Sequence, residues 1–242
     1  MLGKVKGRWG TCEYFLKDEY VGRSMHAYGE YGPAETEKIL ELRGTGLFLD
    51  VGANIGCISQ AVLADGGRVL AFEPQREVFD VLVKNLVHAG GNFEAMNVAV
   101  GSSDGVVKIP VLDYAAKNNI GGLSIGASSN PWGKHRDVSI RSLDSLELED
   151  TVSFIKIDVE GHELEVLKGA VELIKRDKPI LYVENDRPNK EYALKQFIRE
   201  ELGYWMEEHN PTLYREENFF GRKENIWDKN YASYNLLCRP IC

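Results

Sequence analysis

Apolar and polar positions follow two different rhythms along this chain. Short, mostly apolar runs predict strands at residues 46–51, 68–73, 93–99, 153–159, 179–185, 204–208 and 233–239. Segments with apolar residues at helical spacing lie before or between these runs, and they predict helices at residues 33–43, 56–64, 76–89, 163–175 and 190–202. The alternation of strands and helices predicts a doubly wound α/β sheet.

Two of these segments show how the pattern leads to a site. In residues 76–89, Val78, Leu82 and Leu86 recur at helical spacing and predict a face that packs on the core. Residues 153–159 carry apolar side chains on both faces, which predicts a central strand buried on both sides. Ligands of doubly wound sheets bind beyond the carboxyl ends of the strands. We therefore expect the polar residues at these ends to converge on one cleft: Asp50, Glu73, Asn97 and Asp158.

Other segments do not fit the alternation. The first residues are polar and aromatic, with at most a short hairpin around residues 14–21. The predicted organisation is an N-terminal lead-in over residues 1–32 that packs on a single domain over residues 33–242. Insert loops are predicted within that domain at residues 101–145 and 209–231.

The two insert loops have open roles. The first contains a short predicted strand at residues 106–111 and a polar loop at residues 114–137, and a loop of that length is either functional or disordered. The second is rich in aromatic residues: Tyr214, Phe219, Phe220, Trp227 and Tyr231. These side chains line an acceptor pocket, cover the edge of the sheet or form the contact of a homodimer, and we favour the last two roles.

Residues 47–56 contain the most informative local motif, Leu-Phe-Leu-Asp-Val-Gly-Ala-Asn-Ile-Gly. A buried strand here runs into a glycine turn and then into a helix, whose exposed N–H groups favour an anionic group. Residues 68–73 predict a second strand that ends on Glu73, 23 residues after Asp50. An acid in this position accepts hydrogen bonds from a ribose. The spacing therefore predicts a nucleoside ligand.

The glycine turn also discriminates between cofactors. The dinucleotide fingerprint G-x-G-x-x-G requires glycine at positions 52, 54 and 57, but this chain has Gly52, Asn54 and Cys57. The pyrophosphate of NAD or FAD needs the close backbone approach that these glycines allow, whereas the amino-acid end of S-adenosylmethionine does not. The turn therefore favours S-adenosylmethionine over a dinucleotide. A glycine turn that binds no ligand is the remaining alternative.

Several motifs together carry a family resemblance. They are Asp50-Val-Gly-Ala-Asn-Ile-Gly56, Phe72-Glu73-Pro74, Ser142-Leu-Asp-Ser-Leu146, Phe154-Ile-Lys-Ile-Asp-Val-Glu-Gly161 and Val166-Leu-Lys-Gly-Ala170. In order and spacing they resemble the FkbM family of S-adenosylmethionine-dependent methyltransferases over residues 28–186. The resemblance implies a class I methyltransferase fold, which is a Rossmann-like three-layer sandwich. Its sheet has seven mostly parallel strands, of which the last is reversed.

The resemblance and the motif spacing together predict the cofactor site. Glu73 is expected to bind the ribose hydroxyls and Asp50 to lie near the ammonium group of the methionine end. Glu30 is assigned to the methionine end by resemblance, and a solvated loop acid is the equal alternative. The predicted cofactor-binding residues are Glu30, Asp50, Gly52, Ala53, Asn54, Gly56, Glu73, Pro74, Gln75, Asn97, Ala99, Val100 and Asp158.

A cluster of ionisable residues follows strand 153–159 and supplies candidates for catalysis. Asp158, Glu160 and His162 are the predicted catalytic residues, because a base near the methyl group would serve an alcohol acceptor. A structural role for Asp158 and a surface position for His162 stay open. The cluster also has oxygen ligands suited to a divalent cation, and a metal site is an alternative that we do not favour, because the spacing is not a standard metal motif. Glu184, at the end of the next strand, is expected to reach the same cleft.

Composition excludes several classes of partner. The net charge is −8 and no segment concentrates Lys and Arg, which argues against nucleic acid. The chain lacks an apolar run of about 18 residues, so no membrane span is expected. The cysteines, at positions 12, 57, 238 and 242, show no metal spacing, and no secretory signal is evident. These features predict a cytoplasmic location with reduced thiols.

The predicted function is O-methylation of a hydroxyl group on a sugar, a glycan or another small molecule. This acceptor class is implied by the resemblance. Residues 182–188 lack the Asn/Asp-Pro-Pro-aromatic signature of amide or base N-methyltransferases, which is consistent with it. One alternative is a cofactor-binding module without methyl transfer. An NAD-linked oxidoreductase is less favoured, because the turn lacks the required glycines.

Overall fold

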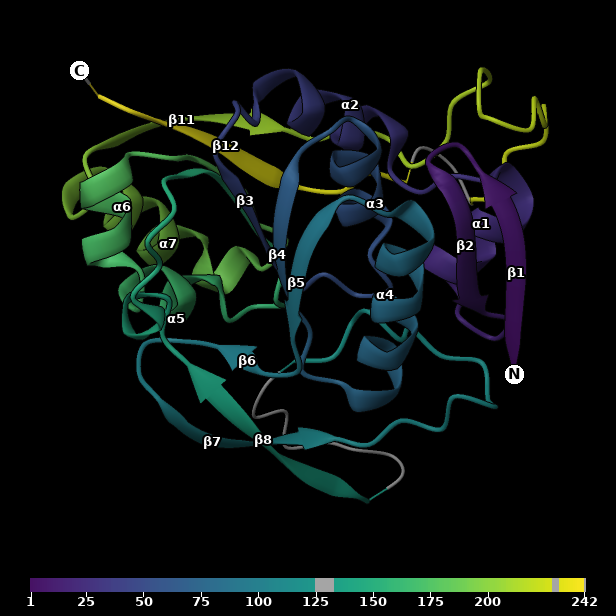
Figure 1. The fold of residues 1–242 in the computed structure, drawn as a ribbon, viewed down its shortest axis with the longest axis horizontal. Coiled ribbons are helices and arrows are strands. Elements are labelled where there is room, and N and C mark those ends of the chain that lie inside the picture. Colours follow the sequence, from purple (N-terminus) through teal and green to yellow (C-terminus); the bar gives the residue numbers. More distant parts are fainter. Residues whose placement is uncertain (125–132, 228–230, 242) are drawn as a thin grey trace.

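Among residues 1–124, 133–227 and 231–241, which the computed structural model describes, seven strands form the central sheet (Figure 1). Their order across the sheet is β11-β12-β10-β9-β3-β4-β5. The bounds are β3 (Leu47–Val51), β4 (Arg68–Phe72), β5 (Asn92–Met96), β9 (Val152–Ile157), β10 (Ile180–Glu184), β11 (Tyr204–His209) and β12 (Asn235–Pro240). Only β12 runs antiparallel to its neighbours in this sheet. The predicted seven-stranded α/β sheet with a reversed last strand is therefore confirmed.

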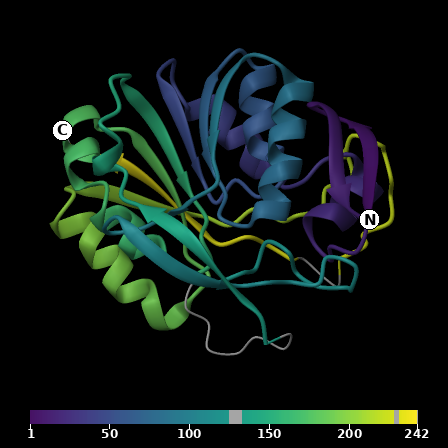
Figure 2. The ribbon, with the colours of Figure 1, turned by 60° about the horizontal axis from the view of Figure 1, so that its bottom comes forward.

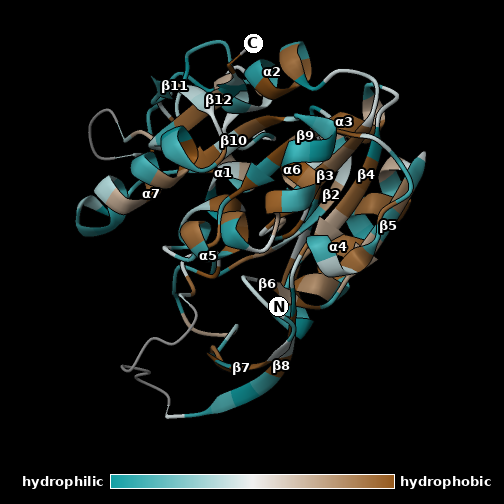
Figure 3. Ribbon diagram, turned by 90° about the vertical axis from the view of Figure 1, so that its left-hand side faces the viewer, coloured by the Kyte–Doolittle hydropathy of each residue, from teal (hydrophilic) through white to brown (hydrophobic). Residues whose placement is uncertain are grey.

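Helices cover both faces of the sheet (Figure 2). One layer consists of α2 (Pro33–Leu42), α3 (Cys57–Ala64) and α4 (Arg76–Ala89), and the other of α5 (Glu163–Lys168), α6 (Val171–Asp177) and α7 (Pro188–Glu200). Successive residues of β3 serve the two layers in turn: Phe48 packs with the first layer and Leu49 with the second. Figure 3 shows the apolar residues concentrated in the central strands β3 and β4. Val78, Leu82 and Leu86 of α4 are fully buried, as their spacing predicts.

The predicted helix over residues 163–175 is wrong as a single element. It is divided into α5 and α6 at Gly169, whose carbonyl accepts a hydrogen bond from the Asp144 backbone at 2.9 Å instead of continuing one helix. A Cβ atom at Gly169 would lie 2.0 Å from the carbonyl oxygen of Gly101. The break therefore comes from a close backbone approach between segments that are distant in sequence.

The N-terminal lead-in is more regular than the sequence pattern indicates. Strands β1 (Leu2–Gly7) and β2 (Gly10–Phe15) form an antiparallel hairpin, and α1 (Val21–Tyr28) follows it. The hairpin predicted around residues 14–21 is therefore wrong. The observed hairpin lies beside α4 (Figure 1), where the Asn85 side chain bonds both the N–H and the carbonyl of Glu13, at 2.7 and 2.9 Å. Tertiary hydrogen bonds thus stabilise a hairpin that has only a weak apolar pattern.

A second, smaller sheet lies near the carboxyl ends of the central strands (Figure 1). It consists of β6 (Ala99–Val100), β7 (Gly105–Pro110) and β8 (His135–Arg141), in the order β6-β8-β7, and a short 3-10 helix, η1 (Asp144–Leu146), follows β8. The predicted strand at 93–99 ends at Met96, because residues 99 and 100 pair with β8 instead. Strand β7 confirms the strand predicted at 106–111. Part of the loop predicted at 114–137 forms β8, and residues 125–132 lie outside the described chain.

Candidate active site

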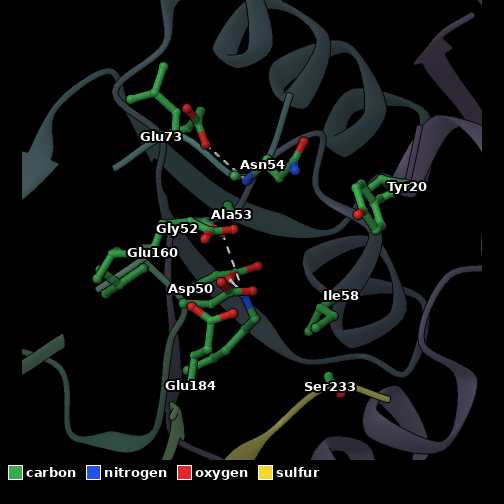
Figure 4. Close-up of a pocket in the computed structure, with 18 of the residues that line it drawn as sticks. Tyr20, Asp50, Gly52, Ala53, Asn54, Ile58, Glu73, Glu160, Glu184 and Ser233 are labelled. Carbon is green, nitrogen blue, oxygen red and sulfur yellow. Dashed lines mark hydrogen bonds and ion pairs between the residues drawn. The ribbon is translucent and has the colours of Figure 1, made fainter. Parts of the chain in front are cut away.

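A cavity of about 610 Å³ lies at the carboxyl ends of strands β3, β4, β9 and β10. Its walls come from distant parts of the chain: residues 20–21, 31, 35, 50–55, 57–58, 72–75, 98–100, 119, 121–123, 156, 158–160, 184, 186–187, 213 and 231–235 contribute to them. Figure 4 shows Glu73 and Asn54 toward one side of the cavity and Glu160 and Glu184 toward the other, with Gly52 and Ala53 between them. The volume falls within the range of small-molecule sites, about 300–1,000 Å³.

The glycine turn after β3 is held tightly against its neighbours. Gly52 has φ +81°, and a Cβ atom there would lie 1.8 Å from the carbonyl oxygen of Asp158. The N–H groups of Gly52 and Ala53 both donate to the carbonyl of Phe72, at 3.1 and 2.9 Å. Only glycine fits this position, since both the backbone angle and the space exclude a side chain.

Glu73 lies at the end of β4 and is 4% exposed. Its Oε1 accepts a hydrogen bond from the Gln75 backbone at 2.8 Å, and its Oε2 accepts one from the Asn54 backbone at 3.1 Å. Burial raises the pKa of Glu73 to about 7, although these two N–H groups act in the opposite direction. Each carboxylate oxygen can accept a second bond, so Glu73 can still receive two hydroxyl groups from a ligand.

Lys156 places a buried cation beneath the turn. It pairs in register with Asp50 across strands β9 and β3, and its Nζ lies 3.6 Å from Asp50 Oδ1 and 3.1 Å from Asp158 Oδ2. Burial acts to lower the pKa of Lys156, but the carboxylates of Asp158, Asp50 and Glu35 raise it above its usual value. Glu35, on α2, is itself buried, and burial raises its pKa to about 7 against the attraction of Lys156.

Carboxyl groups crowd the far side of the cavity. One carboxylate oxygen from each of Asp158, Glu160 and Glu184 lies within 4.8 Å of the other two. Burial, followed by Asp158 and Glu160, raises the pKa of Glu184 to about 11, so this group is protonated at neutral pH. Burial and Asp158 likewise raise the pKa of Glu160 to about 7, while Arg187, which binds the Glu160 carboxylate, opposes the shift.

Most of the predicted site residues lie on the cavity wall. They are Asp50, Gly52, Ala53, Asn54, Glu73, Pro74, Gln75, Ala99, Val100, Asp158 and Glu160. Asn97 and Gly56 are not among the described residues that line the cavity. The Asn97 side chain donates to the carbonyls of Glu73 and Pro74, at 2.8 and 3.1 Å, and Gly56 begins α3 with φ +85°.

Two predicted residues lie elsewhere. Glu30 is 3% exposed, but its carboxylate pairs with Arg8 at 3.1 Å and accepts the Phe219 N–H at 3.0 Å, outside the described cavity wall. The structure thus places Glu30 away from the cavity, where it links the N-terminal hairpin to the 209–231 segment. His162 precedes α5, is half-buried and is not among the described lining residues of the cavity, and burial lowers its pKa.

The sequence pattern missed several residues of the wall. Lys156 and Glu35 are buried charges, and Asp186 and Arg187 follow the end of β10. Lys156 could have been predicted from the sequence, because a lysine inside an apolar strand that is buried on both faces requires a charged partner. Glu35 could not, since an acid in the first turn of a helix usually lies on the surface.

The aromatic insert contributes to two surfaces. Tyr231 lines the cavity, and its ring lies 5.6 Å from that of Tyr20. Trp227 is buried, stacks on Tyr20 at 5.8 Å between ring centroids, and packs with α1. Phe219 and Phe220 remain exposed. The aromatic insert thus covers α1 and also contributes an aromatic side chain, that of Tyr231, to the cavity wall.

Comparison with known proteins identifies the family of this chain. Residues 50–212 match the Methyltransferase FkbM domain. The chain belongs to the FkbM methyltransferase family. This membership confirms the predicted family and supports S-adenosylmethionine as the cofactor. The matched residues begin at Asp50 and include the turn, Glu73 and the acidic cluster.

Individual relatives agree with this assignment. The chain is 31% identical to the hexuronic acid methyltransferase AglP of Haloferax volcanii over 125 residues, which are 50% of this chain and 48% of that protein. The chain therefore spans about half the length of this curated relative. The crystal structure of methyltransferase FkbM from Methylobacillus flagellatus matches 92% of this chain and 56% of its own, with a TM-score of 0.54 and 18% identity.

Other methyltransferases share the fold but differ in their acceptors. An O-methyltransferase from Bacillus cereus, crystallised with S-adenosylhomocysteine, matches 86% of this chain and 81% of its own (TM-score 0.52, 14% identity). An rRNA methylase from Streptococcus thermophilus matches 86% and 95% (TM-score 0.51, 10% identity). The fold therefore does not select the acceptor. Every helix in the described residues is too short or too polar to span a membrane.

Proposed function

We propose that this protein transfers a methyl group from S-adenosylmethionine to a hydroxyl group of a sugar. The observation that carries the proposal is the convergence of the Asp50–Gly52 turn and the buried Glu73 on one cavity of an FkbM-family chain. The name of the relative AglP, a hexuronic acid methyltransferase, supports a sugar as the acceptor class. A homodimer and a cytoplasmic location stay predictions from the sequence.

The residues of the cavity fit this cofactor. Asp50 is 1% exposed; Ser59 donates to its Oδ2 at 2.6 Å, and its Oδ1, which lies 3.6 Å from Lys156 Nζ, has no hydrogen-bond partner. A buried carboxylate oxygen without a donor is costly, and the ammonium group of the methionine end would satisfy it. Glu73 would accept the ribose hydroxyls through its two remaining acceptor positions. The cofactor end of the cavity thus offers acceptors where the cofactor has donors.

Glu160 is the residue best placed to take the proton from the acceptor. When bound, S-adenosylmethionine supplies an electrophilic methyl group, and the protein contributes alignment and a base. Glu160 lines the cavity, and its pKa of about 7 suits proton uptake near neutral pH. Asp158 stands between Glu160 and Lys156, and its ion pair orients it. His162 is not among the described lining residues, so we assign it no catalytic role.

Calorimetric titration with S-adenosylhomocysteine and with NAD tests the cofactor half of this proposal. The wild type is compared with Glu73→Gln and with the exposed control Glu94→Gln on β5. We expect micromolar binding of S-adenosylhomocysteine and about a 10- to 100-fold loss in Glu73→Gln, because a charged acceptor contributes roughly 1.5–3 kcal/mol. The control should bind as the wild type does. Preference for NAD, or equal binding by both variants, would refute the assignment of this cavity.

Methyl transfer to sugars tests the other half. Release of S-adenosylhomocysteine is measured with a panel of simple glycosides, and Glu160→Gln should lower kcat while cofactor affinity stays unchanged. Intact cofactor binding with no transfer to any hydroxyl would instead support a cofactor-binding module without catalysis.

A further inference from the structure

The acceptor end of the cavity is strongly acidic. The described lining residues include seven carboxyl groups and two cationic side chains. The acids are Glu35, Asp50, Glu73, Asp158, Glu160, Glu184 and Asp186, and the cations are Lys156 and Arg187. Asp50 and Glu73 belong to the proposed cofactor end, and Figure 4 shows Glu160 and Glu184 on the side of the cavity away from Glu73.

Both cations are already neutralised by these acids. Lys156 bridges the carboxylates of Asp50 and Asp158 beneath the turn. Arg187 binds Glu160 through one nitrogen and Asp186 through the other. An incoming carboxylate would have to displace one of these partners, and the displaced acid would then lose its own cation.

The site already suppresses one of its own negative charges. Glu184 is protonated at neutral pH, because burial and its neighbours raise its pKa to about 11. An anionic group on the acceptor would meet the same neighbours and the same burial, so its entry is opposed. The buried Asp186 Oδ1 at this end also has no hydrogen-bond partner, and a carboxylate acceptor has no donor to offer it.

We propose that the sugar ring accepted at this end is uncharged and rich in hydroxyl groups, and that the site rejects uronic acids. This inference rests on the function proposed above and adds the substrate class. Neighbouring hydroxyls of a neutral sugar donate to the carboxylates of Asp158 and Glu160 and to the unpaired Asp186 Oδ1. The preference would separate this chain from its relative AglP, a hexuronic acid methyltransferase.

Ligand-observed NMR on the protein saturated with S-adenosylhomocysteine tests this inference. The two probes, methyl β-D-glucopyranoside and methyl β-D-glucuronopyranoside, differ only in the group at carbon 6. We expect the neutral glycoside to bind at least about tenfold more tightly at pH 7.5, because Coulomb repulsion at such short range is strong. The ratio should narrow with added salt if repulsion is its cause.

Two charge variants supply the matched comparison. Glu160→Gln removes one charge and frees one side of Arg187, so the uronate should gain at least about fivefold in affinity while the neutral glycoside gains nothing. Glu149→Gln removes an exposed acid that does not line the cavity and should leave both affinities unchanged. Circular dichroism confirms that each variant is folded.

Three results would overturn the inference. The first is uronate binding that equals or exceeds that of the neutral glycoside. The second is sugar binding that requires Mg²⁺ and disappears with EDTA, because the carboxylates would then be metal ligands. The third is binding of neither sugar while S-adenosylhomocysteine still binds, which would leave the cofactor assignment standing. Failure to bind S-adenosylhomocysteine would defeat the proposed function and this inference together.

Discussion

Gly52 offers the sharpest test of the site geometry. In Gly52→Ala, the new Cβ atom would lie 1.8 Å from the carbonyl oxygen of Asp158 and 2.9 Å from its carbonyl carbon. The backbone at position 52 also has φ +81°, which an L-residue adopts only with strain. The turn and the end of β9 must therefore move apart, and both of these segments line the cavity.

A matched glycine allows the two costs to be separated. Gly66 has φ +76°, and a Cβ atom at this position would have nothing within 4 Å, so Gly66→Ala carries the conformational cost alone, about 1–2 kcal/mol. Gly52→Ala adds overpacking against backbone, typically about 1–3 kcal/mol. We expect Gly52→Ala to lower the free energy of unfolding by about 2–5 kcal/mol, a large part of the roughly 5–15 kcal/mol of a typical domain.

Urea unfolding measures the stability of both variants, and calorimetry measures their affinity for S-adenosylhomocysteine. Gly52→Ala should lose at least about tenfold in affinity in addition to stability, whereas Gly66→Ala should bind as the wild type does. If the two variants are equally stable within about 0.5 kcal/mol and bind equally well, the close approach of Gly52 to Asp158 is not a feature of the protein.

Three further predictions concern buried charge and packing. Lys156→Met should lower the free energy of unfolding by about 3–5 kcal/mol, because it leaves buried carboxylates without a cation. The surface variant Lys175→Met should change this free energy little, and equal effects of the two variants in urea unfolding would contradict the prediction. The pKa of Glu35 is raised by burial from 4.5 to about 7, so its stabilising contribution is complete below pH 4.5 and is lost as the pH rises through 7. Glu35→Gln should therefore reduce the decline in stability across this interval, by up to about 1.4 kcal/mol per pH unit, and an unchanged slope would refute the assignment. On α4, Leu82→Ala should cost about 2–5 kcal/mol and the exposed Val87→Ala less than about 0.5 kcal/mol by the same assay, and the prediction fails if the order is reversed.

Local periodicity was sufficient to predict the central layers. The runs at β3, β4 and β10 are apolar because both faces of those strands are covered. Such a strand can be predicted from its own residues, without knowing which strands pair with it. The spacing of the apolar residues in α4 likewise indicates which face of the helix packs on the core. These elements were predicted to within a few residues, because burial imposes the same pattern wherever the chain folds.

Elements whose stability depends on distant partners were predicted poorly. Strand β8 alternates between exposed residues and buried or half-buried ones, and it is held by its pairing with β6 and β7. The N-terminal hairpin is bound by Asn85, a residue of α4 that carries no sign of that role in its own segment. The division between α5 and α6 depends on the backbone of Gly101, far away in sequence.

The sequence by itself determined the family, the sheet and the residues of the proposed cofactor end of the cavity, because the glycine turn and Glu73 are local motifs whose spacing encodes one strand–helix–strand unit. Only the tertiary structure decided the electrostatics of the proposed acceptor end. The register between β3 and β9 sets Lys156 beside Asp50, and the meeting of β9 and β10 brings Glu160 and Glu184 together. The charge state of a carboxyl group depends on its burial and on neighbours within a few ångströms, and neither is defined until the strands are assembled.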